Sequence, residues 1–172
     1  MSETLLKDWA QRQPLKGKIV LVNVHLTRIT LALITTLLKS GAQVEVTVSP
    51  ELVIHQNALQ PLLAAQIPFY SAIPEEKKQG YYHIVYDCCA GMNDITPIHG
   101  MAKLTKTNPT LYQHMTFPVI TVDSSKTKEI ETGLGTGDSF VRVIHHLAQQ
   151  SLAAWVLNWK NLLDTRITHS PV

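Results

Sequence analysis

The residues of this sequence best suited to chemistry are a histidine, an aspartate and a lysine: His25, Asp87 and Lys128. Histidine can move protons near neutral pH, a carboxylate can hold hydroxyl groups through charge-assisted hydrogen bonds, and lysine can take a proton from a hydroxyl. Each residue also has an ordinary structural explanation. His25 can have a satisfied ring at a helix start, Asp87 can accept hydrogen bonds from loop amides, and Lys128 can be a solvated lysine. Their role therefore depends on whether the fold brings them together.

Apolar runs alternate with amphipathic helical patterns along the chain, which is typical of βαβ units around a parallel sheet. The predicted strands are residues 18–24, 44–48, 67–73, 83–88 and 117–122. The predicted helices are residues 2–13, 27–40, 50–66, 95–106, 138–148 and 151–163. This order predicts an α/β fold, with a doubly wound, mostly parallel sheet flanked by helices as in Rossmann-like or flavodoxin-like domains.

Three polar motifs follow predicted strands, at residues 25–27, 87–91 and 123–128. In a parallel α/β sheet, ligands bind outside the carboxyl ends of the strands. The common placement predicts that the three chemical residues, one in each motif, converge on a single cleft at that edge of the sheet.

The stretch from Pro118 to Ser139 carries the most informative motif, PVITVDSSKTKEIETGLGTGDS. It resembles the pattern P-x-x-N-V-N-D-S-x-T-K-x-x-F-D-N-L-Y-G-T-G-Q-S of the adenosylhomocysteinase (S-adenosylhomocysteine hydrolase) family. Weaker matches follow in the family's order over most of residues 14–145, in the motifs PLKG, HLTRIT, KSGAQVEV, VIHQNAL, AAQIPFYS and VYDCCAGM. The chain therefore resembles the substrate-binding domain of that family.

The resemblance implies a nucleoside site and an NAD-dependent reaction. In that family the ribose is oxidised at its 3′ position, homocysteine is eliminated and water is added. The resemblance implies that the three chemical residues are catalytic. It implies substrate-binding roles for Thr27, Gln56, Asp123 and Glu131, and a cofactor contact at Thr132.

Several positions depart from the family pattern. Ile29 stands where the family has an adenine-contacting glutamate or glutamine, and KTNPTLYQHM stands where it has the segment with its catalytic glutamate. No G-x-G-x-x-G motif follows a predicted strand, so we expect no NAD site in this chain unless a partner domain supplies one. We therefore expect a domain that binds a nucleoside-like small polar ligand and has no hydrolase activity on its own. Two alternatives stay open: a fragment or split subunit of a hydrolase that works with a dinucleotide-binding partner, and a structural or regulatory subunit without a ligand.

The glycine-rich turn GLGTGDSF has a second interpretation. It is also similar to the G-A-G-D-x-F signature of ribokinase-type sugar kinases, and a turn before a helix can bind anions. Those kinases need a longer chain and an upstream nucleotide site that is not evident here. The kinase interpretation is therefore the less favoured one, and a weak phosphate site in another context stays open as well.

The sequence is expected to divide into a substrate-binding domain at residues 1–150 and a C-terminal helix with a tail at residues 151–172, with the NAD-binding domain absent. Apolar residues of that helix form a stripe at helical spacing: Leu152, Trp155, Val156, Trp159, Leu162 and Leu163. Such a stripe covers a neighbouring subunit or packs on its own sheet. We expect a homo-oligomer, most simply a two-fold dimer, and keep packing within the chain as the alternative.

The composition argues against several classes of protein. The 172 residues are 45% hydrophobic and 16% charged, and the net charge of +2 is too small to indicate a nucleic-acid-binding surface. The sequence shows no signal peptide and no apolar run of about 18 residues, so no membrane span is expected. Cys88 and Cys89 are adjacent, which argues against a disulfide framework and fits a cytoplasmic protein. No set of cysteines and histidines has zinc spacing, so no metal site is expected.

Overall fold

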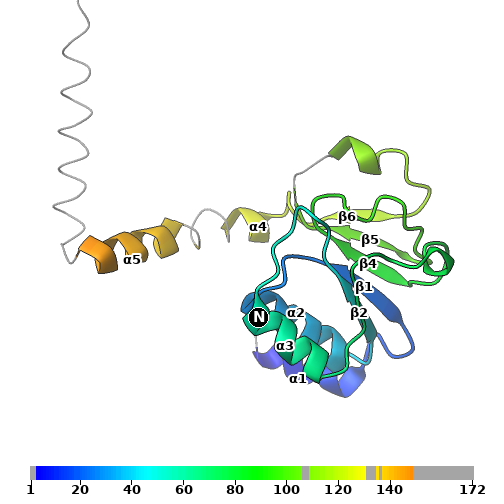
Figure 1. Cartoon of the computed structure of the whole chain (residues 1–172), viewed down its shortest axis with the longest axis horizontal. Coiled ribbons are helices and arrows are strands. Elements are labelled where there is room, and N and C mark those ends of the chain that lie inside the picture. Colours follow the sequence, from blue (N-terminus) through cyan, green and yellow to red (C-terminus); the bar gives the residue numbers. More distant parts are fainter. Residues whose placement is uncertain (1–2, 106–108, 131–134, 136, 149–172) are drawn as a thin grey trace, which may run out of the picture. The chain divides into compact units, whose positions relative to one another are not determined.

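Six parallel strands form a sheet in the order β3-β2-β1-β4-β5-β6 (Figure 1). The computed structural model describes residues 3–105, 109–130, 135 and 137–148. The chain divides into two compact units, Met1–Ser124, which holds the sheet, and Ser125–Val172. The strands are β1 Ile19–Asn23, β2 Gln43–Thr47, β3 Phe69–Tyr70, β4 Ile84–Asp87, β5 Gly100–Lys103 and β6 Val119–Thr121.

The connections among β1, β2 and β3 cover one face of the sheet, and the connections from β3 onward to β6 cover the opposite face. Helix α2 (Arg28–Lys39) joins β1 to β2 and α3 (Gln56–Ala64) joins β2 to β3, with α1 (Glu3–Arg12) beside α2 (Figure 1). Loops and two short 3₁₀ helices, η1 (Glu75–Lys77) and η2 (Pro109–Tyr112), cover the other face. The chain therefore has the predicted doubly wound α/β fold, with the strand order of a Rossmann domain.

The central strand β1 is buried on both faces, which explains its continuous apolar sequence. Val20 and Val22 pack in one cluster with Leu37 of α2, whereas Leu21 belongs to a second cluster with Met101 of β5. The two clusters hold β1 between two layers. The carboxyl ends of β1 and its neighbours are therefore fixed at one edge of the sheet.

The second unit contains α4 (Lys126–Ile130) and α5 (Gly137–Ala148) among its described residues. The sequence predicts α5 correctly, within one residue. The helix predicted at residues 151–163 lies outside the described residues, as does its apolar stripe. In the part of the chain that the structure describes, no helix is long and apolar enough to cross a membrane.

The helix predicted at residues 95–106 is wrong. Residues Gly100–Lys103 form β5, which pairs in parallel with β4 and β6. A Cβ added at Gly100 would lie 2.6 Å from the carbonyl oxygen of Pro118, so the glycine lets β5 and the start of β6 approach each other. Strand pairing therefore overrides a weak helical pattern.

The helix predicted at residues 50–66 begins at Gln56 instead of Pro50. Its expected first turn is a loop that pairs with Leu26, whose N–H donates to the Val53 carbonyl at 2.8 Å and whose carbonyl accepts from the His55 N–H at 2.9 Å. These two bonds keep the loop extended, so the helix starts only after them.

Candidate functional site

The strand order reverses between β1 and β4, and a polar side chain lies at the carboxyl end of each strand. Asn23 ends β1 and Asp87 ends β4, and the two residues are partners in the parallel register. Doubly wound sheets bind ligands in the crevice at this point. These two residues are therefore the starting point of the candidate site.

Asp87 is a fully buried carboxyl group surrounded by donors. Its Oδ1 accepts from Asn23 Nδ2 at 2.9 Å, and its Oδ2 accepts from the Tyr112 hydroxyl at 2.8 Å and from the Met92 N–H at 3.3 Å. Burial raises the pKa of Asp87, and the hydrogen bonds from Asn23 and Tyr112 act in the opposite direction. The pKa of Tyr112 is also raised, first by burial and then by the charge of Asp87. A carboxyl group in such surroundings is a candidate for ligand binding or proton transfer.

Asn23 connects Asp87 to the segment that follows β2. Its Oδ1 accepts from the Ser49 N–H at 2.9 Å, and its Nδ2 also donates to the Cys88 carbonyl at 3.2 Å. Ser49 Oγ is buried and has no hydrogen-bond partner among the described residues. A Cβ added at Gly91 would lie 1.8 Å from that oxygen, so the loop after β4 closes directly on Ser49 only because position 91 is a glycine.

A buried ion pair lies at the carboxyl ends of β5 and β6. Lys103 Nζ is 2.7 Å from Asp123 Oδ2 and donates to the Thr105 carbonyl at 2.5 Å. The side chains of the pair are 5% and 6% exposed. Lys103 Nζ also lies 5.6 Å from the centre of the Tyr112 ring, in a cation–π contact. Asp123 Oδ1 is buried, and no residue in the part of the chain that the structure describes forms a hydrogen bond with it.

Together these contacts form a line of buried polar side chains along the carboxyl edge of the sheet, from the end of β2 to the end of β6. We call it the polar row, and its members are Ser49, Asn23, Asp87, Tyr112, Lys103 and Asp123. Its two outermost members, Ser49 and Asp123, each have one buried oxygen that no described residue satisfies. Such a buried polar atom without a partner costs about 1–3 kcal/mol, so a hydrogen-bonding group supplied there by a ligand or a water is favoured.

A cavity of about 300 Å³ lies at the Ser49 end of the polar row. The ends of β2 and β3 and the loop after β4 line it, with polar side chains from Ser49, Glu51, Ser71 and Asn93 in its wall. This volume is at the lower end of the range for sites that bind small molecules. The cavity is therefore suited to a small polar ligand.

The loop after β4 holds two consecutive residues in the left-handed region. Cys89 has a φ of 60° and Ala90 a φ of 57°, although neither is a glycine. The Cys89 N–H donates to Thr105 Oγ1 at 2.9 Å, and the Met92 N–H donates to the Asp87 carboxyl, so both ends of the loop are tied down. Backbone strain of this kind persists where neighbours fix it, and it clusters at binding and catalytic sites.

His25 follows β1, as the sequence predicts, but its ring is exposed and bound to the backbone. Its Nδ1 accepts from the Val53 N–H at 3.1 Å, and its carbonyl accepts from the Thr30 hydroxyl at 2.7 Å. His25 and Asp87 thus follow neighbouring strands at one edge, the first exposed and the second buried. The contact that the structure gives the His25 ring holds the loop at residues 50–55 in place.

Two of the predicted substrate-binding residues lie at helix starts. Thr27 is the N-cap of α2 and forms a capping box with Thr30, whose hydroxyl accepts from the Thr27 N–H at 2.9 Å. Gln56 is the first residue of α3 and is exposed. The structure explains Thr27 by its cap, and a substrate contact at either residue stays a prediction.

Lys128 lies in α4 of the second unit, where its backbone N–H donates to Ser125 Oγ at 3.2 Å. Because the two units are described separately, the predicted convergence of the three chemical residues stays a prediction. The roles predicted for Glu131 and Thr132 fall outside the described residues. Asp123 belongs to the first unit and is a member of the polar row.

The sequence patterns miss four members of the polar row: Asn23, Ser49, Tyr112 and Lys103. An amide at the end of an apolar run was an available signal for Asn23, because a buried side chain of that type needs several partners. The incorrect helix at residues 95–106 hides Lys103, because only the strand places this lysine at the carboxyl edge. Tyr112 follows a segment without periodicity, and its contact with Asp87 depends on tertiary structure.

No protein-family model matches the chain. Adenosylhomocysteinase from Thermococcus kodakarensis is 27% identical over an alignment of 171 positions that covers 82% of this chain and 41% of that protein. The chain thus spans less than half of the length of this relative, and the weak similarity supports a relationship with it. Among solved structures, an alcohol dehydrogenase superfamily protein from Novosphingobium aromaticivorans has a TM-score of 0.46 at 13% identity, covering 81% of this chain and 50% of that chain. CurK enoyl reductase has a TM-score of 0.48 at 15% identity, covering 87% and 51%.

Proposed function

We propose that this chain binds a small polar, nucleoside-like ligand at the carboxyl edge of its sheet and does not hydrolyse S-adenosylhomocysteine on its own. The observation that carries the proposal is the buried Asp87, which is held by Asn23 and Tyr112 at the point where the strand order reverses. The cavity beside Ser49 and the similarity to adenosylhomocysteinase support it.

The chemistry of the edge selects a ligand that donates hydrogen bonds. Among the described residues, two buried side-chain oxygens have no hydrogen-bond partner: Ser49 Oγ, a hydroxyl that can donate as well as accept, and Asp123 Oδ1. Glu51 adds a carboxylate among the residues that line the cavity. Hydroxyl or amino groups of a ligand can donate to the carboxylates of Asp123 and Glu51, and a ligand hydroxyl can donate to or accept from Ser49, whereas a negatively charged ligand is repelled by the carboxylates. A neutral nucleoside such as adenosine fits these requirements.

Absence of hydrolase activity is expected from the sequence. The reaction needs NAD, and no dinucleotide-binding fingerprint follows a strand in these 172 residues. The chain covers 41% of the length of its relative. In an assay for homocysteine released from S-adenosylhomocysteine, with NAD supplied, the purified chain should give no signal above buffer.

The binding claim is tested by calorimetric titration of the full chain with adenosine and with S-adenosylhomocysteine. We expect saturable binding of adenosine. Ser49→Ala and Glu51→Gln should each weaken it by about tenfold, because the first removes a hydroxyl and the second a negative charge from residues that line the cavity, and neither removes a described hydrogen bond of the fold. Glu76→Gln, an exposed change outside the cavity, is the control and should leave the affinity unchanged.

A second candidate is a subunit of a hydrolase that works with a separate dinucleotide-binding partner. The partial coverage of the relative favours it. This candidate predicts homocysteine release when a dinucleotide-binding partner and NAD are added to the chain. The third alternative, a structural or regulatory subunit without a ligand, predicts no binding in the titration and would displace the main proposal.

A further inference from the structure

Two histidines and a lysine lie together at the amino edge of the sheet, the edge opposite to the polar row. Lys18 directly precedes β1, His83 directly precedes β4, and His99 directly precedes β5. These three strands are parallel neighbours, so the residues before them meet at one edge. The centres of the two imidazole rings are 5.5 Å apart. We call these three residues the amino-edge cluster.

The ring of His83 accepts a hydrogen bond from the start of β1. Its Nδ1 lies 3.1 Å from the backbone nitrogen of Ile19, and the Ile19 carbonyl accepts in return from the His83 N–H at 2.8 Å. A backbone N–H can only donate, so Nδ1 carries no proton in this contact. The bond that holds the first amide of β1 therefore requires a neutral His83 ring.

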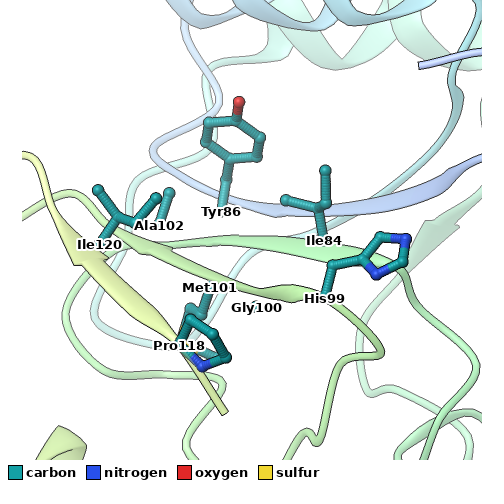
Figure 2. A pocket seen from close by; sticks show the side chains of 8 residues that line it. All are labelled: Ile84, Tyr86, His99, Gly100, Met101, Ala102, Pro118 and Ile120. Atoms are coloured by element: carbon teal, nitrogen blue, oxygen red, sulfur yellow. The ribbon is translucent and has the colours of Figure 1, made fainter. Parts of the chain in front are cut away.

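The ring of His99 is an acceptor as well. Its Nε2 lies 3.0 Å from Lys18 Nζ, and an ammonium group has only donors. His99 is exposed and lines an apolar groove of about 270 Å³ together with Ile84 of β4 (Figure 2). A proton on Nε2 would replace the contact with Lys18 by a repulsion between two positive charges. The geometry thus holds both rings of the cluster as neutral acceptors.

Among the described residues, the charges that act on the His83 ring are those of Lys18 and His99, and both are positive. Burial lowers the pKa of His83 below its ordinary value of 6.5, and these two charges lower it further. The folded state therefore holds a proton on this ring less tightly than the unfolded state does. The stability that the neutral ring contributes is present above pH 6.5 and is lost as the pH falls through the folded-state pKa.

We propose that the amino-edge cluster is an acid-sensitive latch, which fastens the start of β1 to β4 and β5 at neutral pH and releases it when the imidazole rings take up protons. The release is local, because β1 from Val20 to Asn23 stays paired with β2 and β4. The opening therefore concerns Lys18 and Ile19. It leaves the carboxyl edge in place, and it does not depend on any ligand.

Amide NMR of the full chain, recorded as a function of pH, tests the latch. In the wild type the His83 ring and the Ile19 amide should titrate together, with a midpoint below pH 6.5. The protection of the Ile19 amide against hydrogen exchange, corrected for the intrinsic effect of pH, should fall by about tenfold between about pH 7.5 and about pH 5, as expected for one lost hydrogen bond. The Val22 amide, in the middle of β1, should keep its protection.

The variant His83→Asn separates the titration from the hydrogen bond. The asparagine Oδ1 stands near the place of Nδ1 and can accept the same bond, but it does not titrate, so the Ile19 amide should stay protected at both pH values. His55→Gln changes an exposed histidine outside the cluster and is the matched control, which should keep the wild-type response. Lys18→Met removes a positive charge, so the midpoint of His83 should rise toward 6.5.

Several results would overturn the proposal. One is an Ile19 amide whose protection does not change with pH, and another is a fall in protection that persists in His83→Asn. A loss that Val22 shares at the same pH indicates acid unfolding of the whole sheet and contradicts a local latch. If His83→Asn does not fold, the wild type still decides, because separate midpoints for the His83 ring and the Ile19 amide contradict the latch.

Discussion

The pKa of Asp87 reflects two opposing effects, the burial of its carboxyl group and the hydrogen bonds that this group accepts. Burial favours the neutral carboxyl, and the hydrogen bonds from Asn23 and Tyr112 favour the carboxylate. Because the pKa of Asp87 is raised above the ordinary value of 3.8, the folded state holds this proton more tightly than the unfolded state does. The stability that Asp87 contributes is therefore present below pH 3.8 and is lost as the pH rises through the folded-state pKa.

We expect Tyr112→Phe to lower the free energy of unfolding by about 1.5–3 kcal/mol at neutral pH, the range for a hydrogen bond to a charged group. Without this donor the pKa of Asp87 rises further, so the loss should shrink in acid, where the carboxyl is protonated in both proteins. Urea unfolding of the wild type and of Tyr112→Phe, at neutral pH and in acid, measures how the loss of unfolding free energy depends on pH. Tyr86→Phe is the control, because Tyr86 is half-buried and its hydroxyl forms no hydrogen bond with the described residues. If Tyr112→Phe loses the same free energy of unfolding at both pH values, the assigned hydrogen bond to the Asp87 carboxylate is contradicted.

The Lys103–Asp123 pair makes a second prediction at this scale. Lys103→Met should cost about 3–5 kcal/mol of unfolding free energy, because it leaves Asp123 as a buried charge without its partner. The double variant Lys103→Met/Asp123→Leu should recover most of this loss, and strictly additive losses rule the pairing out. Lys78→Met, which removes surface ion pairs with Glu75 and Asp94, should cost much less than Lys103→Met, because exposed pairs are screened by water.

At the scale of the elements, β5 depends on a glycine that no helical pattern explains. Gly100 has a φ of 152° and a Cβ position 2.6 Å from the Pro118 carbonyl, whereas Gly80 has a φ of 66° and open space around its Cβ position. Gly80→Ala should therefore cost about 1–2 kcal/mol for its left-handed backbone alone. Gly100→Ala should cost about 1–3 kcal/mol more, because it also separates β5 from β6. Thermal unfolding of the two variants measures this difference, and equal losses contradict the close approach of the strands.

The strands were the most predictable elements because their sequences are locally decisive. The runs that become β1 and β2 are rich in valine and bounded by turn residues, so the pattern and the tertiary structure agree. Residues 100–103 have no such pattern, and only pairing with both neighbours makes them a strand. The delayed start of α3 has the same cause, since it depends on hydrogen bonds to Leu26.

The candidate site could be predicted only in part, for a related reason. Asp87 and Asp123 were identified because each follows an apolar run and has a counterpart in the family pattern. Their partners Tyr112 and Lys103 come from elements that the sequence does not reveal, and the contacts that define the polar row are all tertiary. The sequence therefore predicted that polar residues lie at the carboxyl edge of the sheet. Which polar side chains are buried against one another there is determined by the tertiary fold.

At the scale of the whole molecule, the proposed ligand is assigned to the carboxyl edge of the sheet. The apolar groove over β4–β6, lined by residues such as Ile84, Ala102 and Ile120, shares no lining residue with the cavity at that edge.

The central claim is that a nucleoside-like ligand binds at the Ser49 end of the polar row. The most direct measurement is a two-dimensional amide NMR titration of the full chain with adenosine. Saturable shifts should concentrate on the amides of Ser49, Gly91 and Met92, which line the cavity, while the amides of Ile84 and Ala102 in the apolar groove stay unchanged. Shifts confined to the groove, or no shifts up to the solubility limit of adenosine, would contradict the account.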